Sequence, residues 1–94
     1  MIKSIKHKGL KKYFYSEGLD TRGVNSDHLN KLRDQLAALD SATEIADVDV
    51  PGWHLHSLKG RYIGRYSIRV SGNWRVTFEF ANGDAYVVDY EDYH

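Results

Sequence analysis

YSIRVSGNWRVTFEFANGDAYVVDYEDYH, residues 66–94, is the stretch that decides the fold, because it predicts three strands joined by two tight turns. Asn82 and Gly83 separate two alternating runs, and both central residues of a type I′ hairpin turn need a positive φ. Residues 71–73, Ser-Gly-Asn, suit a three-residue loop with Gly in the left-handed region. The stretch therefore predicts an antiparallel unit of three strands.

The alternation of apolar residues sets the register of the first two of these strands. Three apolar cross-strand pairs are predicted, namely Tyr66 with Phe78, Ile68 with Val76, and Val70 with Trp74. One face of the sheet is then apolar and available to pack on a core.

The other face carries the charges. In the same register Arg65 lies opposite Glu79, whereas Arg69 lies opposite Arg75. Like charges directly opposed are destabilising, so paired arginines without a carboxylate between them suggest an anion site, usually for phosphate. The alternative is that both guanidinium groups simply point into water.

The third strand is expected to bring further polar groups to this charged face. Counting back from the Asn82-Gly83 turn places Tyr90 beside Arg75, and the period of two brings Asp92 to the same side. The sequence thus predicts that the acidic, aromatic and imidazole groups of residues 92–94 gather near the arginines.

Length and composition set the class of protein. A chain of 94 residues predicts a single domain spanning residues 1–94. Cysteine is absent, which is typical of proteins in a reducing cytosol and removes disulfide and thiol chemistry. No apolar run reaches the length of a signal peptide core or a membrane span, so we expect a cytoplasmic protein without a membrane partner.

The charges are balanced but segregated. Thirteen Lys and Arg match thirteen Asp and Glu, and zero net charge argues against strong nonspecific nucleic-acid binding. Five lysines nevertheless precede the first acid, and residues 53–78 hold five Lys or Arg and no acid. Such segregation predicts a surface with a basic side that can hold phosphate.

The first part of the chain predicts one edge strand and two helices. Residues 1–6 form a weak edge strand, and Leu10, Tyr13 and Phe14 have helical spacing before a stop at Gly18. Ser26 can cap a second helix. Its apolar stripe consists of Leu29, Leu32, Leu36 and Leu39.

One more helical turn is expected in the acidic segment before residues 50–52, Val-Pro-Gly. Residues 53–58 then alternate as a strand with His54 and His56 on one face, and residues 61–64 form a loop. The whole order is β-α-α-β-β-β-β. It predicts an α+β domain with two helices on one face of a mainly antiparallel, curved sheet.

RNA cleavage without a metal ion needs three kinds of group. A base takes the ribose 2′-hydroxyl proton, cations stabilise the charge on the phosphorane, and an acid protonates the leaving oxygen. The side chains that can supply them are His56, Lys59, Arg75, Asp92, Tyr93 and His94. No metal or other cofactor is expected.

Each of these residues also has a structural explanation. His56 is a surface histidine in that case, Asp92 only pairs with Arg75, and Tyr93 only caps the core. His54, His56 and His94 could together ligate a metal, although a histidine set without an acidic ligand at fixed spacing is a weak zinc pattern.

Several motifs resemble the HigB toxins of the RelE superfamily of bacterial toxin–antitoxin systems. They are LHSLKG at 55–60, YSIRVSGNWRVTFEF at 66–80 and GDAYVVDYEDYH at 83–94. The opening MIKSIKHKGLKKYF and the segment LDSATEIADVDVPG at 39–52 are similar to the same family. The resemblance therefore covers essentially the whole chain and implies a RelE-like fold.

The resemblance also implies an activity and partners. It implies an endonuclease that cuts mRNA in the decoding site of the 70S ribosome, and a HigA-type antitoxin with a helix-turn-helix. The family's active-site positions match His56, Lys59, Asp92, Tyr93 and His94, with Arg75 as a phosphate contact. Basic residues expected to contact RNA around them are Lys59, Arg61, Arg65 and Arg69.

Two functions of other classes compete with this one. A catalytically weak or inactive relic would act only as an antitoxin-binding co-repressor. A plain RNA-binding module is disfavoured, because the chain has zero net charge and lacks the exposed aromatic stacking motifs of the RRM kind.

Overall fold

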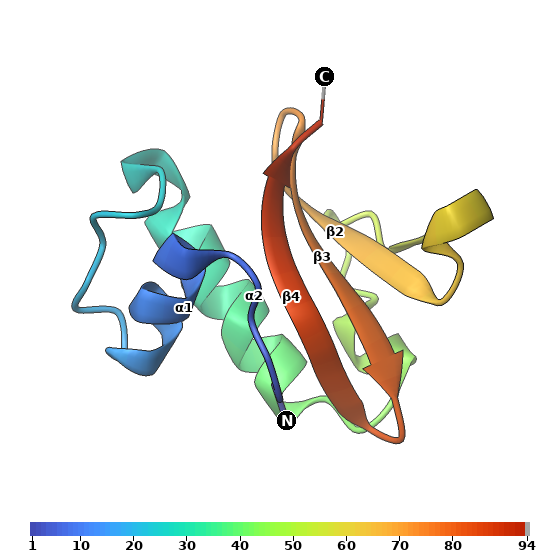
Figure 1. Cartoon of the computed structure of the whole chain (residues 1–94). Coiled ribbons are helices and arrows are strands. Elements are labelled where there is room, and N and C mark those ends of the chain that lie inside the picture. The colour runs from blue at the N-terminus through green and yellow to red at the C-terminus, as the bar shows by residue number, and fades with distance from the viewer. Residues whose placement is uncertain (94) are drawn as a thin grey trace.

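The structure, a computed structural model, describes residues 1–93 and places two helices beside a four-stranded antiparallel sheet (Figure 1). The helices are α1 (Lys8–Tyr15) and α2 (Leu29–Ser41). The strands, adjacent in the order of the chain, are β1 (His56–Ser57), β2 (Arg65–Ser71), β3 (Trp74–Ala81) and β4 (Asp84–Asp92). Short 3₁₀ turns span Ser26–His28, Ile45–Val48 and Gly60–Tyr62.

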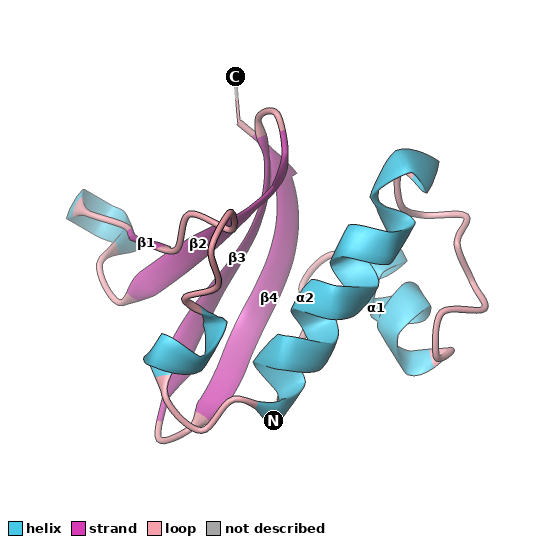
Figure 2. Cartoon of the chain, turned by 180° about the vertical axis from the view of Figure 1, so that it is seen from behind, coloured by secondary structure: helices cyan, strands magenta, loops and turns pink. Residues whose placement is uncertain are grey.

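The predicted α+β class is confirmed, with both helices on one side of the sheet. Figure 1 looks onto the open face, where no helix crosses β2, β3 and β4. Seen from behind in Figure 2, α2 lies beside β4, and the segment between α2 and β1 runs across the covered face. The expected helical turn in that segment is confirmed at Ile45–Val48.

The core lies between α2 and the covered face of the sheet. Leu32, Leu36 and Leu39 of the predicted stripe are buried, and Leu29 is partly buried. They share one cluster with the apolar residues of β2 and β3, where Phe78 is fully buried. Burying each such side chain contributes about 1.5–3 kcal/mol, which fixes the sheet on its helices.

The second helix begins differently from the prediction that Ser26 caps it. Asn25 caps the 3₁₀ turn before this helix, because its side-chain oxygen accepts a 2.9 Å hydrogen bond from the Asp27 N–H, while α2 itself has no side-chain cap at His28. Ser26 opens a 3₁₀ turn, and α2 starts only at Leu29. An Asn one residue earlier offers the same acceptor chemistry as Ser, and the structure uses it.

Residues 1–6 lie along β4, but not as a regular strand. Ile2 pairs with Ala85 and Ile5 with Val88 in two isolated parallel bridges. The position of the expected edge strand is therefore right, although the poor alternation of its apolar residues limits it to separate bridges.

The strand expected over residues 53–58 is reduced to His56–Ser57. His54 has φ +51°, a left-handed conformation that interrupts an extended chain. Trp53 still contacts the sheet, because its carbonyl accepts a 2.7 Å hydrogen bond from the Arg69 N–H. In the expected loop that follows, Gly60–Tyr62 forms a 3₁₀ turn.

The hairpin between β3 and β4 has the predicted turn. Asn82 and Gly83 have φ +53° and +80°, and Ala81 pairs with Asp84. The Asn82-Gly83 prediction is confirmed.

The predicted register of β2 and β3 is confirmed over most of its length. Tyr66 pairs with Phe78, Ile68 with Val76, Arg65 with Glu79 and Arg69 with Arg75. The prediction of Val70 opposite Trp74 is wrong, because a bulge shifts the register and Ser71 takes that position.

A second bulge changes the register of β4. Thr77 pairs with Asp89 but Glu79 pairs with Tyr86, so β4 holds one additional residue, beside Val87 at φ +51°. The placement of Tyr90 beside Arg75 is therefore wrong.

The additional residue reverses the face of the sheet on which every later side chain of β4 lies. Glu91 is therefore the residue opposite Arg75. Tyr90 pairs with Val76, and Asp92 pairs with Trp74 rather than joining the face of Arg75.

Candidate active site

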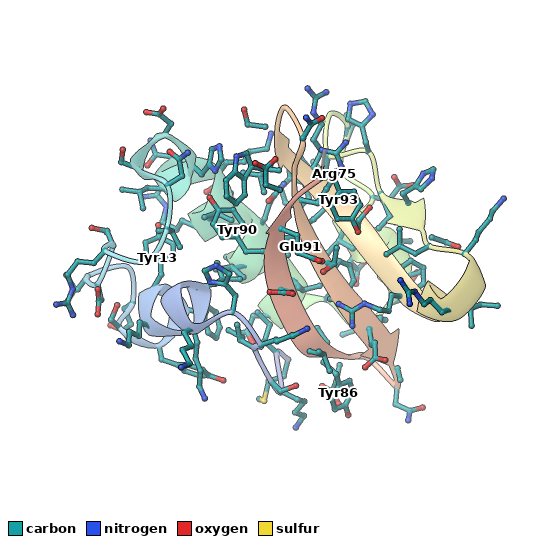
Figure 3. The ribbon with its side chains drawn as sticks, turned by 45° about the horizontal axis from the view of Figure 1, so that its top comes forward. Tyr13, Arg75, Tyr86, Tyr90, Glu91 and Tyr93 are labelled. Atoms are coloured by element: carbon teal, nitrogen blue, oxygen red, sulfur yellow. The ribbon has the colours of Figure 1, made fainter. Side chains whose placement is uncertain are left out.

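The open face of the sheet carries the candidate site at the end where β4 meets the turn between β2 and β3. Figure 3 shows Arg75, Tyr93 and Glu91 on this side, with Tyr90 pointing away toward the helices. The Tyr93 N–H donates a 2.8 Å hydrogen bond to the Asn73 carbonyl, which extends the pairing one residue past β4. Tyr93 is thereby fixed at the site, with 40% of its surface exposed.

A first hollow, which we call the basic hollow, has a volume of about 340 Å³. Its walls come from the segment around β1, from β2 and β3, and from the residue after β4. The lining residues are His54, His56, Leu58, Ser67, Arg69, Arg75 and Tyr93. Two guanidinium and two imidazole groups therefore line the hollow, and among the described residues no carboxylate does.

Arg75 is held beside this hollow by the backbone of the hairpin. Its Nη1 donates to the Gly72 carbonyl at 2.8 Å and to the Trp74 carbonyl at 3.1 Å. Arg69, directly opposite in the register, is exposed. The two carbonyl oxygens partly offset the positive charge of Arg75. An anion bound between Arg69 and Arg75 would offset the remaining repulsion between the guanidinium groups.

A second hollow, the mixed hollow, adjoins the first and has a volume of about 420 Å³. Its lining combines cations, carboxylates and apolar groups. These residues are Lys6, Leu58, Lys59, Arg65, Val87, Asp89, Glu91 and Tyr93. Leu58 and Tyr93 line both hollows and form the wall between them.

A hydrogen-bonded chain forms part of the mixed hollow. An Arg65 guanidinium nitrogen donates to Thr77 Oγ1 at 3.1 Å and to the Val87 carbonyl at 3.2 Å. Thr77 Oγ1 in turn donates to Glu91 Oε2 at 2.6 Å. Thr77 is fully buried beneath these side chains, so the chain orders Arg65 and Glu91 together.

Glu91 and Thr77 were not among the residues predicted for the site. Without the β4 bulge, counting from the turn places Glu91 on the core side, where no role is expected for it. Alternation alone carries no sign of an additional residue.

The structure brings most of the predicted residues together. His56, Arg69, Arg75 and Tyr93 line the basic hollow, while Lys59 and Arg65 line the mixed hollow with Tyr93. Arg61, on the turn Gly60–Tyr62, lines neither hollow, and neither does Asp92. His94 lies outside the described residues.

A buried polar cluster supports β4 from the covered side. Tyr90 stacks on Trp74 with ring centroids 4.6 Å apart, and its hydroxyl shares a 2.6 Å hydrogen bond with His28 Nδ1. Burial raises the pKa of the Tyr90 hydroxyl above its usual value, and the charge of Asp92 adds to the rise despite an opposing hydrogen bond from the Asn25 N–H.

Across residues 1–93, His, Asp and Glu side chains form no group of three or more that could hold a metal ion. Over the same residues no helix has the length and apolar character needed to cross a membrane.

Comparison with known proteins gives two matches. Residues 3–94 match the model of the HigB-like toxin family, described as "RelE-like toxin of type II toxin-antitoxin system HigB". The chain is also 51% identical over 94 residues to the "Endoribonuclease HigB" of Proteus vulgaris, with the whole of both chains covered. This chain therefore belongs to the HigB-like family of RelE-like toxins.

Proposed function

We propose that this protein is the toxin of a type II toxin–antitoxin system and acts as an endoribonuclease on mRNA. The observation that carries the proposal is the basic hollow, which is lined by His54, His56, Arg69 and Arg75 and by no carboxylate from the described part of the chain. Such a lining suits one phosphodiester. Support comes from the full-length similarity to a protein named as an endoribonuclease.

The proposed reaction is a transesterification within the RNA. A base removes the proton of the ribose 2′-hydroxyl, the O2′–P bond forms and the P–O5′ bond breaks. An acid gives a proton to the leaving O5′, so the products are a 2′,3′-cyclic phosphate and a 5′-hydroxyl. This route requires charge stabilisation at the phosphorane and no metal ion.

The roles follow from the position of each side chain. Arg75 and Lys59 stabilise the negative charge that develops on phosphorus-bound oxygens, one from each side of the Leu58–Tyr93 wall. His56 is the acid or orients it. Tyr93, exposed at the border of the two hollows, stacks on a base.

Two groups were expected as the base, Asp92 and His94; because Asp92 pairs with Trp74 and lines neither hollow, we assign this role to His94. Additional RNA contacts are assigned to Arg65, Arg69 and Arg61.

We further propose that cleavage takes place in the decoding site of the 70S ribosome and that a HigA-type antitoxin with a helix-turn-helix silences the toxin. The protein is neutral overall and its lysines are concentrated before residue 13, so tight binding to free RNA is not expected. A ribosome would present the message in an extended, unpaired form, which the two adjoining hollows could receive.

The test is expression of the toxin in a bacterial host, followed by primer extension on translated messages. Cuts within codons of translated messages, with 2′,3′-cyclic phosphate and 5′-hydroxyl ends, are expected. Deoxyribose at the cleaved nucleotide should prevent cutting, because the attacking hydroxyl is then missing. Products with a 5′-phosphate would rule out this reaction.

The same experiment separates the inactive co-repressor. Such a protein would bind its antitoxin and alter transcription of its operon without arresting growth. Growth arrest without new RNA ends would instead point to inhibition by occupancy of the ribosome.

A further inference from the structure

We propose that the mixed hollow is a nucleobase pocket in which Glu91 selects bases carrying an exocyclic amino group over uracil. The inference rests on the proposed function, because it takes the ligand to be RNA. It adds a specificity residue, Glu91, whose position depends on Thr77.

The charges of the two linings indicate that the two hollows bind different parts of a nucleotide. Asp89 and Glu91 line the mixed hollow together with three cations, whereas no carboxylate of residues 1–93 lines the basic hollow. The two carboxylates offset two of the three cations of the mixed hollow, so a phosphate is favoured in the basic hollow, where both arginines are unopposed by a described carboxylate. The neighbouring part of the same nucleotide, its base, is neutral and fits the mixed hollow.

Each carboxylate is positioned through one oxygen. Glu91 Oε2 accepts from Thr77 Oγ1 at 2.6 Å, and Asp89 Oδ1 accepts from the Tyr90 N–H at 2.9 Å. Among the described residues, no donor hydrogen-bonds to Glu91 Oε1 or Asp89 Oδ2. Each side chain thus keeps an acceptor for a ligand, held in place by the bond made through the other oxygen.

Glu91 is the better placed of the two carboxylates to select a base. Thr77 is fully buried and also receives a hydrogen bond from Arg65, so the Glu91 carboxylate is held by an ordered side-chain network. Asp89 is held by the backbone of its own neighbour. We therefore assign the selection to Glu91.

A fixed carboxylate acceptor discriminates among the bases. Adenine, cytosine and guanine each present an amino group beside a ring nitrogen or carbonyl, and Lys6 and Arg65 supply donors for those acceptors. Uracil presents its one N–H between two carbonyl oxygens, which a carboxylate repels. The lining should therefore bind the amino-bearing bases and reject uracil.

The remaining walls suit the faces of a planar ring. Leu58 and Val87 are apolar, and Tyr93 offers an aromatic surface at the border with the basic hollow. A volume of about 420 Å³ lies within the range of small-ligand pockets, which begins at about 300 Å³. A single base fits within such a space while its phosphate lies beyond Tyr93 and Leu58.

The experiment is an NMR titration of the full-length, ¹⁵N-labelled protein with the four nucleoside 3′-monophosphates. For the unaltered protein we expect shifts at Thr77 and Glu91, and dissociation constants for the adenine, cytosine and guanine nucleotides about tenfold below that for the uracil nucleotide. Glu91→Gln should remove this preference, because an amide can also donate to uracil. Glu79→Gln is the matched control, since Glu79 is exposed on the same strand face but does not line the hollow.

Thr77→Val and Thr77→Ser test how Glu91 is positioned. Valine removes the hydroxyl that bonds Glu91 and should weaken the preference, while serine retains the hydroxyl and should preserve it. Spectra of the free variants report whether each one folds.

The pocket is overturned by equal affinity for all four nucleotides, by no binding of any of them, or by a preference that survives Glu91→Gln. These results are separable from those on cleavage. A protein that binds with the expected preference but cuts no message would contradict the proposed function and leave the pocket standing. A protein that cuts message but shows no base preference would contradict the pocket and leave the proposed function standing.

Discussion

The backbone N–H of Tyr93 donates a hydrogen bond of 2.8 Å to the carbonyl of Asn73, in the turn between β2 and β3. This contact ties the residue after β4 to the turn on which Arg75 is also anchored, through the Gly72 carbonyl. One turn therefore positions two of the groups assigned to the reaction.

Deletion of His94 should abolish cleavage and leave the fold intact. The pairing of β3 with β4 extends through Trp74 and Asp92, and Tyr93 has its own anchor, so none of these contacts is removed. Loss of an acid or base lowers the rate by about 100-fold or more. Growth arrest and thermal unfolding are the measurements, with antitoxin binding as the control; full arrest by the shortened protein would exclude His94 from the mechanism.

Arg75→Glu should disarm the toxin, because a carboxylate would then face the phosphate in the basic hollow. Loss of a single group that stabilises transition-state charge costs roughly 100- to 1,000-fold in rate, and reversal of its charge should cost at least as much. Arg33→Glu is the matched control, since Arg33 is an exposed arginine on α2 and lines neither hollow. Comparable cutting by the two variants, measured by primer extension, would remove Arg75 from the site.

Tyr90→Phe should change how stability depends on pH in alkaline solution. The folded protein raises the pKa of Tyr90 above 10.0, so it holds this proton better than the unfolded chain does. The resulting stability is complete below about pH 10 and is lost as the pH rises through the higher folded pKa. Urea unfolding across this range should show a shallower decline in Tyr90→Phe than in the unaltered protein.

Tyr15→Phe is the control for that measurement, because Tyr15 is 57% exposed. At neutral pH Tyr90→Phe should also cost roughly 1–3 kcal/mol, since buried His28 loses its partner. An unchanged alkaline slope would show that Tyr90 does not contribute to it.

Gly9→Ala should destabilise the protein, against the usual effect of alanine in a helix. Gly9 lies in α1, where alanine is favoured over glycine by about 1 kcal/mol. A Cβ at this position would, however, overlap the Gly23 carbonyl, and overpacking of this kind costs about 1–3 kcal/mol. Urea unfolding measures the difference, with the exposed Lys12→Ala as control; a stabilised Gly9→Ala would contradict the close approach of the two segments.

The parts of the fold that could be predicted are those set by local sequence. Asn82 and Gly83 tolerate a positive φ, so the turn followed from residue chemistry. The leucine stripe of α2 and the apolar pairs of β2 and β3 followed from periodicity, because burial requires one apolar face.

The parts that could not be predicted depend on interruptions of that periodicity. Val87 adopts φ +51° although it is β-branched, and such residues are poorly suited to the left-handed region. Nothing in the residue type marks the bulge, and it exchanges the sides of Asp92 and Glu91. The arginines of the basic hollow could be predicted, because they precede the β4 bulge in the chain. The carboxylates of the mixed hollow could not, because they follow it.

The unusual backbone of Val87 has a cost and a use. A residue other than glycine in this conformation stores about 1–3 kcal/mol of strain. Two hydrogen bonds hold Val87 in it: Ser4 Oγ accepts from the Val87 N–H at 2.8 Å, and Arg65 donates to the Val87 carbonyl. Glycine at this position would relieve this strain and raise the stability of the folded protein. It would also favour the bulged register over an unbroken ladder, in which Glu91 would turn inward, so the strain at Val87 weakens the same register that puts Glu91 on the open face.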